Sequence, residues 1–445
     1  MEKIKQPSVA GTFYPADADE LKKQIESFKE NNKNTYEVPA RAVIVPHAGL
    51  VFSGRLAYEG ISQLDKNIKN IFIIAPAHRV GFLGLGLSSF DFWETPLGKI
   101  ELNQQIIQEL KEKFGADYQD DAIAPEHALE IEVPIIQSVF NDVKIVPILV
   151  GNSTPDKIEE IISHYYPNPE NGFVISSDLS HYLKHEDAMK MDIFTSQLIE
   201  NGICDNFTPN NACGVVGIVG LIKFANKNKF SLIRIDTTNS SSVTGDTSRV
   251  VGYGTWFLFE GEKNTFLKEY YSDFILDLCR RSLNAQFDTG RLEIKFPKVF
   301  AEGGACFVTL EKNNQLRGCI GSIIPHRTLI EDIVINAQHA AFKDHRFNPV
   351  TKEEIPELQI AVSLLSLPQK MSFKDEEDLL GQIKPFKDGI IIRDGNYQSV
   401  YLPSVWEQLP DKKEFLRSLK VKAGLSPDYF SNTFEAYRFE TVYIK

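Results

Sequence analysis

The chain has 445 residues, of which 42% are hydrophobic and 24% are charged. This is the composition of a globular protein, and the length exceeds what one ordinary hydrophobic core supports, so two or three domains are expected. Residues 1–262 carry 23 Lys and Arg against 35 Asp and Glu, a net charge of −12, whereas residues 263–445 carry 25 of each kind. The acidic first part argues against broad binding of nucleic acids or anionic membranes, because both require an excess of cations.

Segment composition and cysteine spacing bear on the cellular compartment. No run reaches the roughly 18 apolar residues of a membrane span, and the first twenty residues lack the apolar core of a signal peptide. The five cysteines are widely spaced and form no CxxC pair, which is typical of reduced thiols rather than of a disulfide framework. They also provide no cysteine triplet for an iron–sulfur cluster. We therefore expect a cytoplasmic protein without a membrane segment.

Strand-like and helix-like segments alternate through the first 260 residues. Apolar runs bounded by turn residues predict strands, and amphipathic stretches such as residues 102–114 predict helices between them. The predicted strands lie at residues 40–49, 70–81, 143–151, 172–182, 231–236 and 250–260. Continuous apolar strands that alternate with helices favour an α/β fold, in which a mostly parallel sheet is covered by helices.

A short, polar and turn-prone segment at residues 261–265 coincides with the change in charge balance. We therefore place a domain boundary between residues 1–262 and residues 263–445. The second part predicts a helix at 266–283, a strand at 305–313, a helix at 328–342, strands at 358–366, 389–395 and 398–403, and a further helix. Residues 316–322 fall between a strand and a polar turn. This order predicts a smaller α+β domain with mixed strands.

Reactive side chains follow three of the predicted strands at their carboxyl ends. His47 follows RAVIVP, His78 follows IFIIAPA, and Asp178 and His181 follow FVIS. In an open parallel sheet, ligands bind just beyond these ends. Imidazoles with an anionic partner suit iron, copper or zinc. Each histidine taken alone is more often structural, but their matching positions predict one shared metal-type pocket.

Cys213 and His127 each allow a functional and a structural interpretation. Cys213 precedes the start of a predicted helix, where a thiol pKa is lowered and the thiolate can act as a ligand or nucleophile. A small, buried core thiol is the alternative. His127 begins an apparent amphipathic helix, EHALEIEVPII, so it could contact substrate from above the sheet. A plain capping or packing role is the alternative for this histidine.

Asp178 lies three residues before His181 and could orient a histidine as a supporting carboxylate, or cap a helix that follows the strand. Cys213, His181 and Asp178 could also serve as nucleophile, base and orienting group of a cysteine hydrolase. That arrangement leaves His47 and His78 without a role, whereas metal binding uses all of these residues.

Six motifs in the first 260 residues resemble the Memo family: AGTFYP (10–15), VPHAGLVFSG (45–54), APAHRVG (75–81), EHALEIEVP (126–134), SSDLSHY (176–182) and NACGVVG (211–217). Memo proteins are similar to class III extradiol dioxygenases, whose non-haem iron is held by two histidines and a carboxylate. The resemblance implies that His47 and His78 are the two imidazole ligands. It also implies that Cys213 stands where the dioxygenases have their glutamate, and His181 where they have their catalytic base. A thiolate in place of the carboxylate shifts the metal preference toward copper(I), zinc or a more covalent iron site.

The second part resembles the AMMECR family across residues 266–445, through LRGCIGS (316–322) and the segments at 341–366, 389–408 and 414–426. Within LRGCIGS, Arg317 offers a planar donor fork suited to a carboxylate or phosphate. Cys319 lies beside a cation and could therefore be a reactive thiolate. A glycine-rich strand and turn with a packed cysteine is the alternative. Asp344, His345 and Arg346 are candidate groove residues or members of a hydrogen-bonded turn.

The two families together resemble components of the AmmeMemoRadiSam system, which a separate radical S-adenosylmethionine enzyme completes. Covalent joining of the domains indicates that they serve one pathway. Our hypothesis is a metal-dependent, dioxygenase-like oxidoreductase that acts with that enzyme on a small molecule or peptide. Its Fe(II), Cu or Zn would be held by His47, His78 and Cys213, with His181 as acid and base. A non-enzymatic metal- or peptide-binding scaffold, and a hydrolase that uses Cys213 or zinc-bound water, remain as alternatives.

Overall fold

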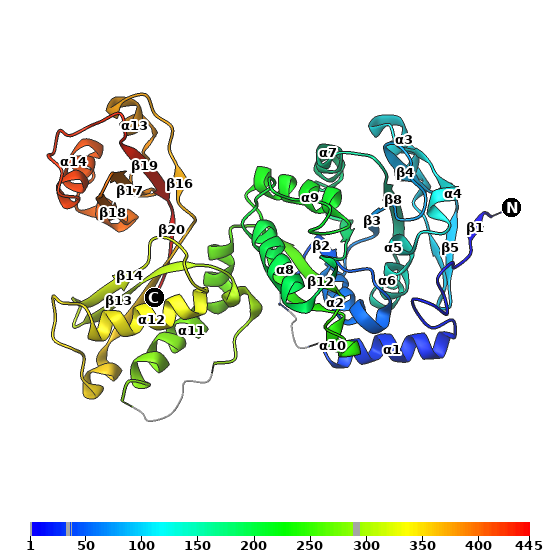
Figure 1. The fold of residues 1–445 in the computed structure, drawn as a ribbon, viewed down its shortest axis with the longest axis horizontal. Helices are drawn as coiled ribbons and strands as arrows, with labels where there is room; N and C mark the ends of the chain where they lie inside the picture. Colours follow the sequence, from blue (N-terminus) through cyan, green and yellow to red (C-terminus); the bar gives the residue numbers. More distant parts are fainter. Residues whose placement is uncertain (1, 33–35, 37, 288–293) are drawn as a thin grey trace. The chain divides into compact units, whose positions relative to one another are not determined.

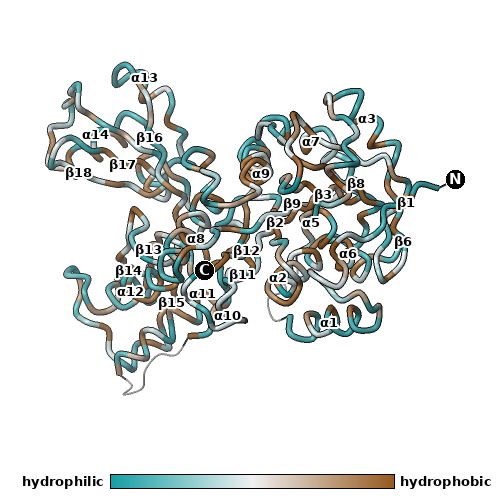
Figure 2. The backbone as a smooth tube through the Cα atoms, turned by 45° about the vertical axis from the view of Figure 1, so that its right-hand side comes forward, coloured by the Kyte–Doolittle hydropathy of each residue, from teal (hydrophilic) through white to brown (hydrophobic). Residues whose placement is uncertain are grey.

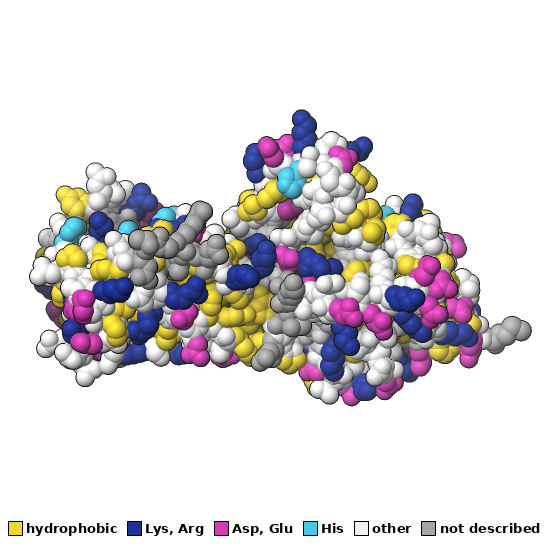
Figure 3. All heavy atoms as spheres, turned by 90° about the horizontal axis from the view of Figure 1, so that it is seen from below, with side chains coloured by type: hydrophobic (Ala, Val, Ile, Leu, Met, Phe, Trp, Pro, Cys, Tyr) yellow, Lys and Arg dark blue, Asp and Glu magenta, His cyan; other side chains and the backbone are white. Residues whose placement is uncertain are grey.

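The computed structural model describes residues 2–32, 36, 38–287 and 294–445. Its internal contacts divide the chain into two compact units, Met1–Lys263 and Asn264–Lys445 (Figure 1). Within the described residues, no helix has both the length and the apolar character that crossing a membrane requires. Acidic side chains gather on part of the surface of the first unit, in keeping with the net charge of −12 over residues 1–262 (Figure 3).

A nine-stranded sheet forms the centre of the first unit, in the order β10-β12-β2-β9-β3-β8-β4-β7, with β11 paired to β12. The four strands β2, β9, β3 and β8 are parallel neighbours and are almost entirely buried, because their sequences are nearly continuous apolar runs. A separate three-stranded sheet has the order β1-β5-β6. The strand bounds are β1 Ile4–Lys5, β2 Ala42–Val45, β3 Asn70–Pro76, β4 Leu85–Leu87, β5 Phe92–Thr95, β6 Gly98–Glu101, β7 Asp117–Tyr118, β8 Lys144–Val150, β9 Asn171–Ser176, β10 His181–Leu183, β11 Ser231–Asn239 and β12 Val250–Phe259.

Helices cover both faces of this sheet. On one face α9 packs against β3 and β9, and on the other α2 packs against β2 and β12 while α5 packs against β3 and β8. In Figure 2 the central strands are coloured hydrophobic, whereas α1 is largely hydrophilic. The helix bounds are α1 Ala18–Glu30, α2 Leu50–Gln63, α3 Gln104–Phe114, α4 Asp120–Ile123, α5 His127–Glu130, α6 Glu132–Val139, α7 Pro155–Tyr165, α8 His185–Glu200, α9 Val215–Asn228 and α10 Ser241–Thr244.

The predicted α/β class of the first unit is confirmed, including the mostly parallel order of its central strands. The short strands β4, β7 and β10 were not predicted. Each has only two or three residues, which is too few to produce a recognisable hydrophobic pattern. They extend the sheet at its two ends and do not alter the parallel centre.

The second unit contains two four-stranded antiparallel sheets, in the orders β14-β13-β15-β20 and β16-β19-β17-β18. Helix α12 packs against β13 and β14, and α14 packs against β18. This is the α+β arrangement that the sequence predicted. The bounds are α11 Lys263–Asn284, β13 Ala305–Lys312, β14 Gln315–Gly321, α12 Leu329–Phe342, β15 Gln359–Leu365, β16 Gln369–Lys370, α13 Glu376–Gln382, β17 Gly389–Asp394, β18 Tyr397–Tyr401, α14 Lys412–Lys422, β19 Glu435–Phe439 and β20 Thr441–Ile444, with 3₁₀ turns at Lys298–Ala301, Lys352–Glu357 and Pro403–Glu407.

Residues 316–322, expected between a strand and a turn, lie almost wholly within the edge strand β14. Gly318 explains how α12 can lie so close to this strand. A Cβ atom at Gly318 would be 2.0 Å from the carbonyl oxygen of Ala340 in α12, so only glycine fits there. The glycine pattern of this motif therefore serves the packing of a helix on an edge strand.

Candidate metal centre

Three neighbouring parallel strands each deliver a polar side chain to the same edge of the sheet. The residue two positions after the end of β2 is His47, after β9 it is Asp178, and after β3 it is His78. Because β2, β9 and β3 are adjacent and parallel, these side chains lie beyond the same edge.

Three imidazoles meet at this edge. His127, the first residue of α5, joins His47 and His78, and one nitrogen atom from each ring lies within 4.8 Å of the others. The ring centroids are 5.1 Å apart for His47 and His78, 5.4 Å for His47 and His127, and 4.8 Å for His78 and His127. Since a metal–nitrogen bond measures about 2.1 Å, this spacing places three donors around a volume that one ion can fill.

Glu126 forms hydrogen bonds with His78 and lies close to His127. Its Oε1 atom lies 3.0 Å from Nδ1 of His78 and 3.0 Å from Nδ1 of His127, and its Oε2 atom accepts the backbone N–H of His78 at 2.7 Å. Burial alone would raise the pKa of Glu126, but the contacts with His127 and His78 outweigh burial and hold the pKa well below its usual range. A carboxylate only accepts hydrogen bonds, so His78 carries its proton on Nδ1 and keeps the Nε2 lone pair for a ligand bond.

Ser176, the last residue of β9, fixes the tautomer of His47. Its Oγ atom lies 2.8 Å from Nδ1 of His47, donates to the carbonyl of Ala128 at 2.8 Å, and lies 3.1 Å from Oε1 of Glu132. The hydroxyl has one proton, and the carbonyl of Ala128 can only accept, so Ser176 accepts from Nδ1 of His47. Burial raises the pKa of Glu132 well above its usual value, which keeps a proton on that carboxyl. His47 is therefore protonated on Nδ1, and its Nε2 is a lone-pair donor.

Cys213 touches this nitrogen but is not part of the three-imidazole cluster. Its Sγ atom lies 3.2 Å from Nε2 of His47 and accepts the backbone N–H of Asp178 at 3.3 Å. Burial, followed by the charge of Asp178, raises the pKa of Cys213 to about 12. The lowered pKa expected at the start of α9 is therefore wrong, because burial outweighs the helix terminus. The protonated thiol donates to the nitrogen that a metal ion would use.

The side chain of Asp178 holds the backbone of His47 in place. Its Oδ1 atom accepts the backbone N–H of His47 at 2.8 Å, and β10 rather than a helix follows it, so it caps no helix. Nδ1 of His181 lies 2.8 Å from the carbonyl oxygen of Leu179, which can only accept. His181 therefore holds its proton on Nδ1 and leaves Nε2 free to act as a base. The next residue, Tyr182, has a left-handed φ of 59°, which is a strained conformation for a non-glycine residue.

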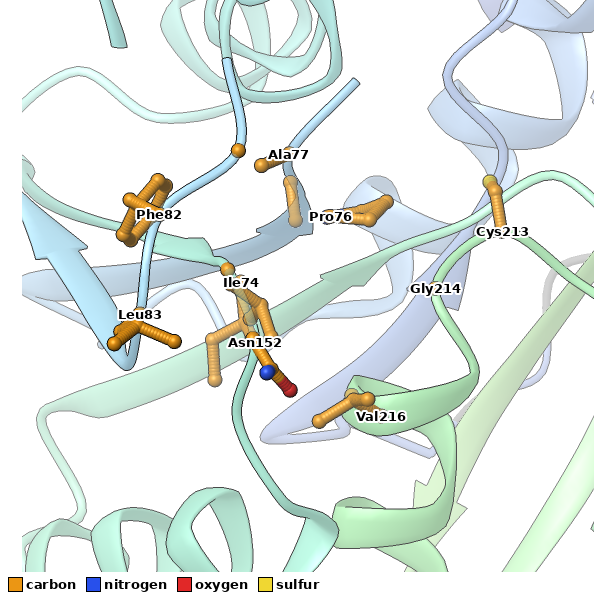
Figure 4. A pocket seen from close by; sticks show the side chains of 14 residues that line it. Ile74, Pro76, Ala77, Phe82, Leu83, Asn152, Cys213, Gly214 and Val216 are labelled. Carbon is orange, nitrogen blue, oxygen red and sulfur yellow. The ribbon is translucent and has the colours of Figure 1, made fainter. Parts of the chain in front are cut away.

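The imidazoles and the predicted acid–base residues share one pocket of about 780 Å³. None of the described side chains that line it is Lys or Arg. Burial, and then the neighbouring His78 and His127, lower the pKa of His47 far below its usual value, so this ring stays neutral. A second pocket of about 600 Å³ lies on the other side of Cys213, at the start of α9 (Figure 4). Its walls are mostly apolar, with Phe82 and Leu83 opposite Val216.

A nucleophile–base–orienter chain is not formed by Cys213, His181 and Asp178. Among the described contacts, the imidazole neighbour of Cys213 is His47. Nδ1 of His181 is directed at a backbone carbonyl, and Asp178 holds a backbone amide. The high pKa of the thiol and the low pKa of His47 are also the reverse of an activated thiolate–imidazolium pair.

The supporting residues Glu126, Ser176 and Glu132 were missed in the sequence. A usable signal exists for Glu132, because it interrupts the apolar run EHALEIEVPII at a position that a packed helix buries. Ser176 carries no such signal, because serine at the end of a strand is common.

In the second unit the structure separates the two predicted site residues. Arg317 is engaged by Glu354, at 3.2 and 3.0 Å, and by the carbonyl of Asn348 at 2.8 Å. The backbone of Cys319 instead contacts Asp344 and Arg346. His345, the third predicted groove residue, is exposed.

Known proteins similar to this chain match its two units separately. Residues 5–257 match the family model described as Memo-like protein, and residues 276–444 match the model described as AMMECR1. A MEMO1 family protein from Thermoplasma volcanium is 31% identical over 262 residues, covering 57% of this chain and 97% of that protein. One from Methanobrevibacter smithii is 32% identical over 285 residues, covering 57% and 98%. The crystal structure of an uncharacterized protein from Pyrococcus horikoshii is 34% identical, covers 39% of this chain and 89% of that chain, and has a TM-score of 0.36.

Proposed function

Because the chain belongs to the Memo-like protein family through residues 5–257 and continues into an AMMECR1 domain, we propose that its first unit is a metal-dependent, dioxygenase-like oxidoreductase. The observation that carries the proposal is the convergence of His47, His78 and His127 within 4.8 Å. Two of these rings have Nδ1 engaged and Nε2 available, which is the state that a metal ligand requires.

The residues present fit iron(II), copper or zinc. Three imidazoles are ordinary ligands for each of these ions, and Cys213 can add a soft donor once its proton leaves. The nearest carboxylate, Glu126, supplies negative charge behind two of the rings. A bound ion would supply Lewis acidity and, in the case of iron or copper, electron transfer. Compared with our sequence-based set of His47, His78 and Cys213, the proposal adds His127 as a ligand.

The remaining pocket residues act on the substrate. His181 has a base-competent Nε2 atom and lines the same pocket, so it can take a proton from a bound substrate and return it later. A pocket of about 780 Å³ accommodates a small molecule or one peptide side chain. The dispersed cysteines offer no cluster-binding triplet, so the proposal assigns radical chemistry to a separate S-adenosylmethionine enzyme.

Metal analysis of anaerobically purified protein and its variants tests the proposal. We expect one equivalent of iron, copper or zinc in the wild type, and a loss of affinity of at least about 10²-fold in His47→Ala, His78→Ala and His127→Ala. His181→Ala should keep the metal but lose substrate-dependent oxygen consumption. His164→Ala is the matched control, because His164 pairs with Glu109 away from this pocket.

Each alternative has its own outcome. Retention of one metal equivalent in a His47→Ala/His78→Ala double variant contradicts the shared site. Stoichiometric zinc with a trapped acyl group favours the hydrolase, and a tightly held peptide without turnover favours the scaffold. If His127→Ala keeps the metal while Cys213→Ser loses it, the ligands are His47, His78 and Cys213, and His127 belongs to the substrate pocket.

A further inference from the structure

The edge strand β14 presents Cys319 on the face opposite to α12. Side chains alternate along a strand, and Gly318 is the residue that faces α12. Cys319 therefore faces the other side, where it pairs with Thr309 of β13. The Thr309 hydroxyl lies 3.4 Å from Sγ of Cys319, and the cysteine is only half-buried. The thiol is thus accessible at the edge of a sheet rather than enclosed in the core.

The turn after α12 places a cation beside this thiol. Asp344 accepts the backbone N–H of Cys319 at 2.9 Å, and Arg346 binds both oxygens of Asp344 at 2.9 and 2.7 Å. Nη2 of Arg346 also donates to the carbonyl oxygen of Cys319 at 3.3 Å. The side chain of Arg346 remains 56% exposed, and its Nη1 atom has no hydrogen-bond partner among the described residues. One side of the guanidinium is therefore available to a ligand.

Helix α14 carries a second cation, Lys422, close enough to these residues to interact with them electrostatically. Nζ of Lys422 donates to the carbonyl of Val400 at 2.9 Å and lies 4.8 Å from the ring centre of Tyr401. Burial, and then the charge of Arg346, lower the pKa of Lys422, whereas Cys319 raises it, so the three groups lie within electrostatic range of one another. Lys422 uses one of its three donors on Val400. Among the described contacts no carboxylate neutralises it, unlike Arg317, which Glu354 holds.

We propose that Cys319, Arg346 and Lys422 form a binding site for a small ligand that carries a carboxylate or a phosphate. The anion would lie between the two cations, with the thiol directly beside it. The site contains two cations, Arg346 and Lys422, and one carboxylate, Asp344, so it retains a net positive charge. The free donors of Arg346 and Lys422 match the acceptor oxygens of either anion. This assigns ligand recognition to the second unit, independently of the metal centre in the first.

Thiol–disulfide exchange with two reagents of different charge tests this site. Dithiobis(nitrobenzoate) carries a carboxylate on each ring, and dithiodipyridine is neutral. In both reactions the thiolate attacks the S–S bond, a mixed disulfide forms, one aromatic thiolate leaves, and the thiol proton passes to solvent. The two reaction rates are measured at each cysteine of the full chain by peptide mass spectrometry. Taking the ratio of the anionic to the neutral reagent at one cysteine cancels differences in thiol pKa and accessibility between cysteines. Cys204 is the internal reference, because it is also half-buried and has one cation, Lys223, but two acids, Asp205 and Asp156, near it.

We expect the rate ratio of the anionic to the neutral reagent to be higher at Cys319 than at Cys204. At Cys319 this ratio should fall about threefold in Lys422→Gln and about threefold in Arg346→Gln. One unit charge at about 6 Å in water changes the rate of encounter with the anionic reagent by that factor. Lys413→Gln is the matched control, since it removes the same charge from the first turn of the same helix and should leave the ratio unchanged. Lys422→Gln keeps a donor for the Val400 carbonyl, so it retains the fold even if Arg346→Gln disturbs Asp344.

Protection experiments identify the anion. Inorganic phosphate or succinate is added during reaction with the neutral reagent, against sodium chloride at equal ionic strength. Protection of Cys319 by phosphate indicates a phosphate ligand, and protection by succinate indicates a carboxylate ligand. Protection by neither anion overturns the proposal, as does a reagent ratio at Cys319 that stays unchanged in both Lys422→Gln and Arg346→Gln.

Discussion

The two candidate sites surround their carboxylates with different partners. In the first unit, burial raises the pKa of Asp178 and Asp192, which accept hydrogen bonds from the backbone amides of His47 and Ser180. In the second unit, Arg346 holds the pKa of Asp344 well below its usual range, and Arg317 lowers the pKa of Glu354 to about 2. Carboxylates of the first site are thus buried without a lysine or arginine, and those of the second are paired with one.

This difference indicates what each site lacks. The pocket of the first unit has a neutral His47 ring, a carboxylate behind His78 and His127, and no described Lys or Arg in its walls, so added positive charge is favoured there. The site of the second unit already holds cations, so added negative charge is favoured. The same chain therefore offers one site for a metal cation and one for an organic or inorganic anion.

The two thiols should differ most strongly in reactivity. Cys213 is half-buried like Cys319, but burial raises the pKa of its thiol to about 12, which lowers its thiolate fraction about tenfold for each pKa unit above an ordinary thiol. At pH 7.5 and without metal, we expect iodoacetamide to modify Cys213 on the order of 10²- to 10³-fold more slowly than Cys319. The rates are read peptide by peptide, with buried Cys279 and Cys306 as slow references. A fast reaction at Cys213 that requires His181 would contradict the metal assignment and support the hydrolase.

The buried carboxylates should give opposite pH dependences of stability. The pKa of Asp192 is raised to about 6 in the folded state, so the native chain binds this proton more tightly than the unfolded chain. The first unit should therefore lose up to about 3 kcal/mol of unfolding free energy as the pH rises from about 4 to above 6. The pKa of Asp344 is lowered, so its contribution is instead lost as the pH falls below about 4.

Hydrogen exchange of the core-strand amides, corrected for the intrinsic exchange rate, measures the free energy of unfolding of each unit separately. Asp192→Asn should reduce the loss at rising pH in β9 and β12, where Asp178 contributes a loss of the same sign, and Asp344→Asn should flatten the loss at falling pH in β13 and β15. If stability changed with pH in the same direction in both units, the proposed contrast between their carboxylates would be incorrect.

Removing the charge of Glu126 should have the smallest effect of the three. Glu126→Gln keeps the size of the side chain but replaces a carboxylate that contacts two imidazoles. We expect metal affinity to fall about 10- to 100-fold, as for other residues that orient metal ligands. Isothermal titration with zinc measures the change, and Glu112→Gln on the exposed face of α3 is the control. Unchanged affinity in Glu126→Gln would remove Glu126 from the metal centre.

Much of the first unit and part of its site could be derived from sequence. Apolar runs of the length of a strand, alternating with amphipathic stretches, require a buried parallel sheet, and the carboxyl ends of such strands converge. His47 and His78 could be assigned to one edge for that reason alone. The second unit was predicted as α+β, but β14 was not recognised, because glycines at Gly318 and Gly321 weaken the strand pattern.

Tertiary structure alone decided which groups meet and in what charge state. His127 joins the two strand-end imidazoles because α5 packs over β3 and β8. The local sequence pattern does not predict that His127 contacts these two rings. Burial reversed the expected pKa shift of Cys213. The cation nearest to Cys319 is Arg346, 27 residues away, whereas Arg317, two residues away, is held by Glu354. Local sequence sets the periodicity of elements, but the electrostatic state of a side chain depends on partners and solvent exclusion that arise only when distant segments pack.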